Sequence, residues 1–265
     1  MILLLITIAI LYCTLVLGMV VLQRRLMYHP TVGEIAPSFH GLAHFTDTTI
    51  TSEDGTPLQL WYHEATRGMP TVIYFHGNAG HLGDRAGLFA ALAEKGLGVA
   101  AVSYRGYGKS KGRPHEQGIY ADARAAVKWV KSQGIPLSDI GFYGESLGTG
   151  VAIKMSTEFS PRCLFLQAPY TSVSGRAAEI YWFVPVKYLI RDHFDSLSRI
   201  KHVQAPVTIF HGKEDAVIPP HHAEKLLAFA NDPKRAFFFD GVGHTEFDND
   251  VLARHVVESF PPKLH

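Results

Sequence analysis

A serine flanked by glycines is the feature of this sequence with the clearest chemical meaning. Gly144-Glu145-Ser146-Leu147-Gly148 follows a short apolar stretch, residues 140–143, and precedes a stretch of helical character, residues 147–159. A serine at a tight turn from strand to helix projects its hydroxyl outward, and glycines on both sides relieve the crowding of that turn. The pattern therefore predicts Ser146 as a nucleophile.

Two downstream loops supply the partners that such a serine needs. Its hydroxyl requires a base to take the proton, and the base requires a carboxylate to orient it. The predicted strand over residues 207–210 runs into a loop with Glu214 and Asp215, and the predicted strand over residues 235–240 runs into a loop with His244. Ligands bind beyond the carboxyl ends of the strands in open α/β sheets. We predict His244 as the base and Asp215 as the acid, with Glu214 as the alternative acid.

A loop of small residues, His76-Gly77-Asn78-Ala79-Gly80, follows the predicted strand over residues 71–75. A plain turn is one interpretation of this pentapeptide. In a chain with a nucleophilic serine, its backbone N–H groups also suit the charged oxygen of a tetrahedral intermediate. We predict Asn78 and Leu147 as the two donors of this oxyanion hole.

Short apolar stretches alternate with helical stretches along most of the chain. The apolar stretches are rich in β-branched and aromatic residues, as strands buried on both faces are. They cover residues 71–75, 98–104, 140–143, 163–167, 207–210 and 235–240. The helical stretches cover residues 117–133, 147–159, 221–230 and 246–259. An opening hairpin is predicted from residues 45–52 and 58–64. The alternation predicts an α/β fold, a mostly parallel central sheet with helices on both faces.

The connection between residues 167 and 207 is longer than a usual crossover between strands. It contains the aromatic stretch Tyr181-Trp182-Phe183-Val184-Pro185. One interpretation is a crossover helix with a packed aromatic side chain. The other is a small cap-like insertion over residues 173–205, or a surface that touches lipid or an acyl chain. The sequence leaves both open.

The amino terminus is strongly apolar, because residues 1–22 carry no charged side chain. As a helix this segment would reach about 33 Å, against about 30 Å for the hydrocarbon core of a bilayer. A cleaved signal peptide would have a basic residue before the apolar stretch and small residues at a cleavage site. Neither feature is clear here, which favours a retained anchor.

These patterns predict three parts: a transmembrane anchor over residues 1–23, a linker over residues 24–40, and a catalytic domain over residues 41–265. Arg24 and Arg25 directly follow the predicted anchor. The excess of positive charge on the cytoplasmic side of membrane proteins then favours a single-pass protein with a cytoplasmic catalytic domain.

Several kinds of function find no support in the sequence. The net charge of +1, with no basic run, argues against a nucleic-acid partner. No metal site and no cofactor are predicted, since the His221-His222 pair lacks a third ligand in the sequence. The loop over residues 104–110 is interpreted as a packed turn, because it lacks the Lys-Ser/Thr pair of a phosphate-binding loop. Cys13 and Cys163 stand in apolar surroundings, so we expect both to be buried and unpaired.

Five motifs occur in a fixed order: His-Gly-Asn-Ala-Gly (76–80), Tyr-Arg-Gly-Tyr-Gly-Lys-Ser (104–110), Gly-Glu-Ser-Leu-Gly (144–148), His-Gly-Lys-Glu-Asp (211–215) and Gly-Val-Gly-His (241–244). Together they resemble the α/β-hydrolase superfamily over nearly the whole chain. More narrowly, the chain resembles single-span, membrane-anchored members, a serine aminopeptidase- and lysophospholipase-like group that includes protein-depalmitoylating members. One departure is Thr245-Glu246, where relatives often have a small polar pair.

The resemblance implies that Ser146, Asp215 and His244 form a catalytic triad, with Asn78 and Leu147 at the oxyanion positions. It implies hydrolysis of a carboxylic ester or thioester through an acyl-enzyme on Ser146. A membrane anchor makes lipid or acylated substrates the expected partners. Two alternatives stay open: a serine peptidase of the same fold, and a non-catalytic membrane-anchored scaffold.

Overall fold

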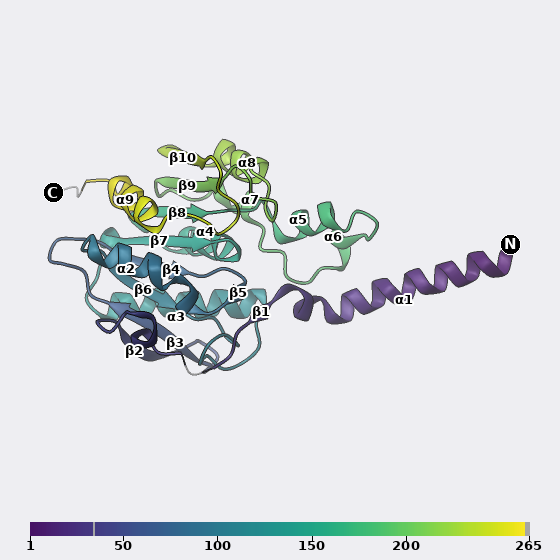
Figure 1. Ribbon diagram of the computed structural model, residues 1–265, viewed down its shortest axis with the longest axis horizontal. Helices are drawn as coiled ribbons and strands as arrows, with labels where there is room; N and C mark the ends of the chain where they lie inside the picture. The colour runs from purple at the N-terminus through teal and green to yellow at the C-terminus, as the bar shows by residue number, and fades with distance from the viewer. Residues whose placement is uncertain (34, 263–265) are drawn as a thin grey trace.

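An eight-stranded sheet forms the centre of the computed structural model, which describes residues 1–33 and 35–262 (Figure 1). The strands lie in the order β10-β9-β8-β7-β4-β6-β3-β2. Their bounds are β2 Thr46–Thr51, β3 Pro57–His63, β4 Thr71–Phe75, β6 Gly98–Val102, β7 Ile140–Glu145, β8 Cys163–Gln167, β9 Val207–Gly212 and β10 Lys234–Phe239. The neighbours β2 and β3, and β3 and β6, pair antiparallel, and the other neighbours pair parallel. The predicted mostly parallel sheet is confirmed.

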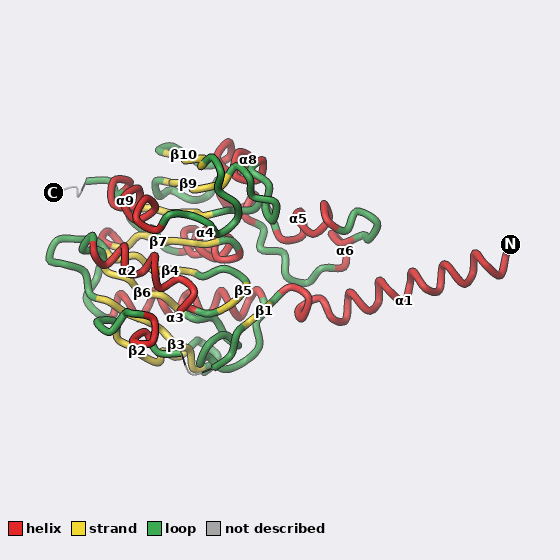
Figure 2. The backbone as a smooth tube through the Cα atoms, viewed as in Figure 1, coloured by secondary structure: helices red, strands yellow, loops and turns green. Residues whose placement is uncertain are grey.

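Helices cover both faces of the sheet (Figure 2). One face carries α2 (Ala86–Glu94) and α9 (Asn249–Ser259), and the other carries α3 (Glu116–Ser132), α4 (Leu147–Glu158), α7 (Ser196–Ile200) and α8 (His221–Phe229). Successive residues of β4 divide between the faces: Val72 and Tyr74 join the core under α2 and α9, and Ile73 and Phe75 join the other core. This alternation follows from the two-residue period of a strand. The predicted α/β fold is confirmed.

Some element boundaries differ from the prediction by a few residues. Strand β7 continues to Glu145, so it ends directly before Ser146. The helix expected from residue 246 begins at Asn249, because the side chain of Asp248 accepts a hydrogen bond from the N–H of Val251 at 2.9 Å. An aspartate in this position caps a helix amino terminus. The difference moves the helix away from the loop that holds His244.

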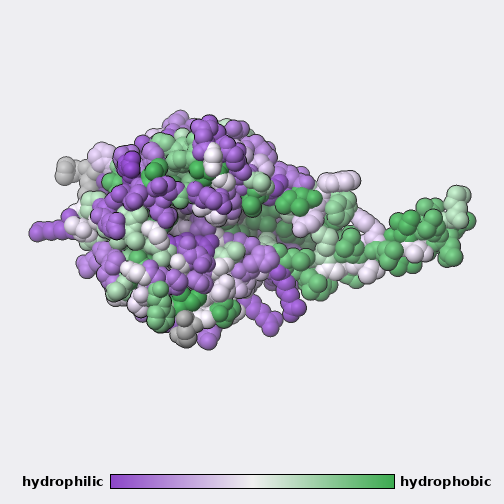
Figure 3. Space-filling view, viewed as in Figure 1, coloured by the Kyte–Doolittle hydropathy of each residue, from purple (hydrophilic) through white to green (hydrophobic). Residues whose placement is uncertain are grey.

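The amino-terminal helix α1 (Ile2–Met27) projects from the domain, and Figure 3 shows it as a mostly hydrophobic rod. Its most apolar window has a mean hydropathy of 2.7, and none of that window is buried. By length and composition α1 is able to cross a membrane, a test that a signal sequence near the amino terminus also passes. Cys13 lies on this helix and is exposed, so its predicted burial was wrong, whereas Cys163 is buried as expected.

Two short helices in the long connection, α5 (Val173–Ile180) and α6 (Val186–Leu189), stand away from the sheet and lie beside the end of α1 (Figure 1). We refer to residues 173–190 as the α5–α6 segment. Its aromatic side chains are largely exposed, with Trp182 at 82% and Tyr188 at 90% of full exposure. The interpretation as a crossover helix with a packed aromatic side chain was therefore wrong.

The chain that leaves α1 joins the loop after β4. Strand β1 (His29–Pro30) pairs parallel with β5 (Ala79–Gly80) in a separate two-stranded sheet. Three short 3-10 helices complete the structure: η1 Pro37–His40, η2 Leu82–Arg85 and η3 Leu137–Asp139. The predicted linker thus carries main-chain hydrogen bonds to the loop predicted to form the oxyanion hole. Residue 34 of that linker and residues 263–265 of the predicted catalytic domain lie outside the described residues.

Candidate active site

Ser146 occupies a strained turn between β7 and α4. Its φ of 49° and ψ of −115° lie outside the regions favoured by a residue with a side chain. The flanking glycines allow the close packing that holds this turn. A Cβ atom on Gly148 would lie 1.9 Å from the carbonyl oxygen of Phe75, and one on Gly144 would lie 2.4 Å from the carbonyl oxygen of Gly148. The motif is thus required by packing as well as by the turn itself.

The structure brings Ser146, His244 and Asp215 into one chain of hydrogen bonds. Nε2 of His244 lies 2.9 Å from Oγ of Ser146, and Nδ1 of His244 lies 2.7 Å from Oδ2 of Asp215. The three residues come from the ends of β7, β9 and β10, which lie at the same edge of the sheet. This geometry suits a base that takes a proton from the serine and a carboxylate that orients the base.

Asp215 is fixed in position by its own loop. Its Oδ1 atom accepts hydrogen bonds from the N–H groups of Val217, at 2.9 Å, and Ile218, at 2.8 Å. Burial opposes ionisation of this carboxyl group. The hydrogen bonds from His244 and Ile218 outweigh burial and lower its pKa below the ordinary value. Glu214, the alternative acid, is exposed, whereas Asp215 is buried and lies 2.7 Å from Nδ1 of His244, so the geometry favours Asp215.

A buried ion pair lies directly behind the nucleophile. Glu145 accepts hydrogen bonds from Arg85 at 2.8 and 2.9 Å, and it also accepts one from the hydroxyl of Tyr74. Burial raises the pKa of Glu145, but the adjacent guanidinium of Arg85 more than offsets this and the pKa is lowered overall. Sequence reasoning missed this pair, because Arg85 is 60 residues away, in the short helix η2, and belongs to no catalytic motif.

His76 shapes the loop that precedes the candidate oxyanion site. Its Nδ1 atom lies 2.7 Å from the carbonyl oxygen of Gly77, and its Nε2 atom accepts a hydrogen bond from the N–H of Tyr104 at 3.1 Å. Both ring nitrogens are therefore occupied when the ring is neutral. Complete burial, followed by the nearby charge of Arg85, lowers the pKa of His76 to about 3. A neutral histidine thus ties this loop to the chain that follows β6.

The two predicted oxyanion donors lie at the same end of the sheet as Ser146. Leu147 is the first residue of α4, where N–H groups have no partner within the helix. The carbonyl of Asn78 accepts a hydrogen bond from the hydroxyl of Tyr107 at 2.7 Å. The side-chain amide of Asn78 donates to the main-chain carbonyl of Met27. The amide is therefore engaged with α1, and the backbone N–H of Asn78 is the group left to serve an oxyanion.

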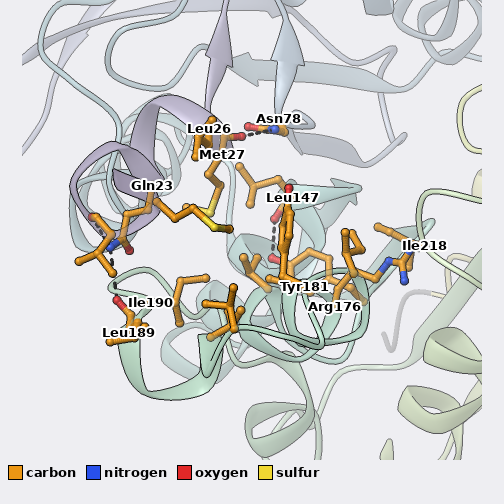
Figure 4. Close-up of a pocket in the computed structure, with 18 of the residues that line it drawn as sticks. Gln23, Leu26, Met27, Asn78, Leu147, Arg176, Tyr181, Leu189, Ile190 and Ile218 are labelled. Atoms are coloured by element: carbon orange, nitrogen blue, oxygen red, sulfur yellow. Dashed lines mark hydrogen bonds between the residues drawn. The ribbon is translucent and has the colours of Figure 1, made fainter. Parts of the chain in front are cut away.

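An apolar pocket of about 310 Å³ adjoins Ser146 and Leu147 (Figure 4). This volume lies at the small end of the range for ligand pockets. Its walls come from the last turns of α1 and from the α5–α6 segment, with side chains such as Val20, Val184 and Leu189. Among the described residues that line it, Arg176 is the one charged side chain. The pocket suits an apolar group attached to a carbonyl that Ser146 could attack.

One cluster changes the sequence-based view of the histidine pair. Glu179 of α5 lies 3.2 Å from Nε2 of His222 and 3.4 Å from Nε2 of His221, so the structure brings a third potential metal ligand to this pair. No third ligand is near the pair in the sequence, since 43 positions separate Glu179 from His222, and only folding supplies one. Nδ1 of His222 also contacts the hydroxyl of Thr171 at 2.9 Å. These contacts connect α5 to α8 without requiring an ion.

The fold and the sequence both have recognisable relatives. An esterase of Pyrococcus furiosus, Pf2001, superimposes with a TM-score of 0.70 at 21% identity, over 88% of this chain and 96% of that one. An alpha-beta hydrolase from Vibrio vulnificus gives a TM-score of 0.68 at 21% identity, over 82% and 81%. The family model of serine aminopeptidase, S33, matches residues 68–199. Uncharacterized protein Rv2307c of Mycobacterium tuberculosis is 40% identical over 84% of this chain and 81% of its own length. The chain belongs to the α/β-hydrolase superfamily.

Other relatives of this α/β hydrolase include a named lipase. Lysophosphatidylserine lipase ABHD12 of Rattus norvegicus is 32% identical over 78% of this chain. The match spans 56% of the length of that lipase. The chain is thus a hydrolase similar to esterases and lipases, which confirms the family resemblance seen in the sequence motifs.

Proposed function

We propose that this α/β hydrolase cleaves carboxylic esters or thioesters of acyl-chain substrates through an acyl-enzyme on Ser146. The observation that carries the proposal is the position of the Ser146 hydroxyl. It is hydrogen-bonded to His244 on one side and adjoins an apolar pocket on the other. A serine hydroxyl hydrogen-bonded to a histidine is the arrangement that covalent catalysis uses. The apolar pocket favours substrates whose carbonyl carries an apolar acyl group.

The reaction would proceed in two halves. Nε2 of His244 takes the hydroxyl proton as Oγ of Ser146 bonds to the carbonyl carbon, and the backbone N–H groups of Leu147 and Asn78 stabilise the resulting oxyanion. The bond to the leaving oxygen or sulfur then breaks, and His244 returns the proton to that atom. In the second half His244 takes a proton from water as the water oxygen bonds to the acyl carbon. The bond between that carbon and Oγ of Ser146 then breaks, His244 returns the proton to Oγ, and the carboxylic acid leaves.

A serine aminopeptidase is the second candidate, because the matching family model carries that description. An aminopeptidase must bind a positively charged terminal amine, which calls for a carboxylate or an array of acceptors near the nucleophile. The described pocket lining contains Arg176, which is paired with Glu179 at 3.0 Å, and contains no carboxylate side chain that could hold an amine. The chemistry of the pocket therefore favours acyl esters over peptides.

We also propose that α1 anchors the protein in a membrane as a single span, with the domain on the cytoplasmic side. Support comes from the apolar length of α1 and from the exposed Arg25 that follows the span. A Lys201→Cys variant, substituted at an exposed position, tests the orientation. Labelling by a membrane-impermeant maleimide in permeabilised cells but not in intact cells supports the proposal, and labelling in intact cells contradicts it. The parent protein, which has Cys13 and Cys163, provides the background.

The decisive experiment is labelling with a fluorophosphonate probe, followed by hydrolysis of p-nitrophenyl esters from acetate to palmitate. We expect the full-length protein to react with the probe and Ser146→Ala to lose both labelling and hydrolysis. Ser198→Ala, at an exposed serine on α7, is the matched control and retains both. Aminoacyl p-nitroanilides test the peptidase alternative.

Two outcomes would contradict the proposal. Labelling that survives Ser146→Ala would place the nucleophile elsewhere. Absence of labelling in wild-type protein with a normal circular dichroism spectrum would favour the non-catalytic scaffold.

A further inference from the structure

The membrane-type helix α1 forms one wall of the pocket beside Ser146. Met19, Val20 and Met27 line the pocket from α1, and Ile180, Val184 and Leu189 line it from the α5–α6 segment (Figure 4). A helix that served only as a tether would not line the pocket next to the nucleophile. The position of α1 therefore decides the shape of the site.

Polar contacts join α1 to the end of the α5–α6 segment and to the two residues that follow it. Arg24 donates two hydrogen bonds to the carboxylate of Asp192, at 2.9 and 3.0 Å. The side chain of Gln23 donates to the carbonyl of Leu189 at 3.3 Å and accepts from the N–H of Arg191 at 2.7 Å. The contacts of Gln23 thus pair two main-chain groups at the end of the segment, and the ion pair of Arg24 with Asp192 fixes the chain that follows.

A second contact lies much further along α1. The hydroxyl of Tyr12 donates to the carbonyl of Phe183 at 2.8 Å. Tyr12 and Gln23 are eleven residues apart (23 − 12), which corresponds to about 16 Å along a helix axis. Half of a hydrocarbon core of about 30 Å is about 15 Å. The α5–α6 segment thus follows α1 over a length equal to one leaflet.

The outer surface of the α5–α6 segment has the composition of a membrane-contacting surface. Residues 180–186 carry no charge. Trp182 and Tyr188 are exposed at 82% and 90%, and Ile180 at 50%. Tyr188 is next to Leu189 at the domain end of α1, where a tyrosine suits the boundary between membrane and water. Trp182 is next to Phe183, which contacts Tyr12, and there its large ring would face acyl chains. Lys187, in the middle of this surface, has the long stem that lets a charge reach the headgroups.

We propose that the α5–α6 segment lies in the leaflet nearest the domain, alongside α1, and that acyl chains pass from this leaflet into the pocket between them. The substrate class is then an ester whose acyl chain already lies in the bilayer. This inference rests on the proposed function for its chemistry, but the seating of the segment in the membrane is independent of any activity.

Membrane seating is tested with full-length protein in liposomes made from brominated phospholipids, which quench nearby tryptophan fluorescence. Trp182 is exposed, whereas Trp61 is buried and Trp129 is partly buried in the domain. We expect quenching relative to unbrominated liposomes, and we expect Trp182→Phe to remove most of it. Quenching that survives Trp182→Phe, or fluorescence that is quenched by aqueous iodide instead, would overturn the proposal.

The pocket wall is tested with neighbouring variants on α1. Val20 lines the pocket, and Val21 is 67% exposed on the outside of the helix. We expect Val20→Trp to lower kcat/KM for palmitate esters by on the order of tenfold, since overpacking an apolar site is costly. Acetate esters, which fill less of the pocket, should lose less activity, so the ratio of the palmitate rate to the acetate rate falls. Val21→Trp should leave both rates unchanged.

The outcomes separate this inference from the proposed function. Equal palmitate rates in Val20→Trp, Val21→Trp and wild type would overturn the role of α1 as a wall. If wild type hydrolyses no ester at all, the proposed function and the route for acyl chains both fail. The fluorescence result alone then decides whether the α5–α6 segment lies in the membrane.

Discussion

The side-chain amide of Asn78 donates a hydrogen bond to the main-chain carbonyl of Met27, the last residue of α1. The loop proposed to stabilise the oxyanion is therefore tied to the end of a helix able to cross a membrane. The same loop pairs with the chain just beyond that helix, through His29 and Ala79. Contacts at the base of α1 thus bear directly on the geometry beside Ser146.

Replacing Asn78 by Ala removes this tie while keeping the backbone N–H proposed as the donor. We expect kcat for p-nitrophenyl butyrate to fall by on the order of tenfold to a hundredfold, because a small misplacement of a catalytic group is costly. KM should change little. Asn231→Ala is the matched control, since Asn231 also donates to main-chain carbonyls, at 2.8 and 2.9 Å, on another loop. An unchanged kcat in Asn78→Ala would mean that the loop holds its position without α1.

Asp215→Asn tests the choice of acid. An amide in place of the carboxylate cannot stabilise the histidine cation and favours the wrong tautomer, so we expect kcat to fall by about 10⁴-fold, as in other triads. KM should stay close to its original value. Glu214→Gln at the neighbouring exposed residue should retain full activity. The reverse result, with loss of activity in Glu214→Gln alone, would assign the acid role to Glu214.

Arg24→Gln should destabilise the junction between α1 and the domain. The side chain of Asp192 is 4% exposed. Without Arg24 its carboxylate would keep the hydrogen bond from the hydroxyl of Tyr28, at 3.1 Å. A buried carboxylate that loses a charged partner costs about 1–3 kcal/mol. For a domain of this size each kcal/mol lowers the thermal midpoint by about 2–4 °C. Thermal unfolding of the full-length protein in detergent measures the effect. Arg25→Gln, next to it and exposed, should change the midpoint much less.

The pH dependence of stability should report the burial of His76. Its pKa of about 3 in the folded protein lies below the ordinary 6.5, so the folded state resists protonation. The stability linked to the neutral ring is fully present above pH 6.5 and is lost as the pH falls toward 3. The contribution is at most about 1.4 kcal/mol per pH unit. Denaturant unfolding at a series of pH values measures the slope.

His76→Gln should reduce this slope, whatever it does to stability at neutral pH. The same substitution at the exposed His202 should leave the slope as in wild type. An identical slope in His76→Gln and wild type would show that other groups control the acid transition.

Local pattern and chain order alone predicted the fold and the set of candidate residues. A serine between a strand and a helix can take a strained tight turn when glycines flank it, so five residues were enough to predict the turn at Ser146. Asp215 and His244 could be proposed because parallel strands end at one edge of a sheet. The long apolar segment predicted a helix of the length that α1 has, since composition decides this without reference to other parts of the chain. The catalytic roles of these residues stay predictions.

Other features depend on contacts between segments that no local pattern encodes. Asn78 reaches Met27 across 51 positions, Arg85 reaches Glu145 across 60, and Glu179 reaches His222 across 43. Charge and hydrogen-bonding capacity are visible in a sequence, but the partner is chosen by packing. The sequence left the role of the aromatic stretch at residues 181–185 open for the same reason. Only the tertiary structure placed it beside α1, because the contact of Tyr12 with Phe183 joins positions that are 171 residues apart.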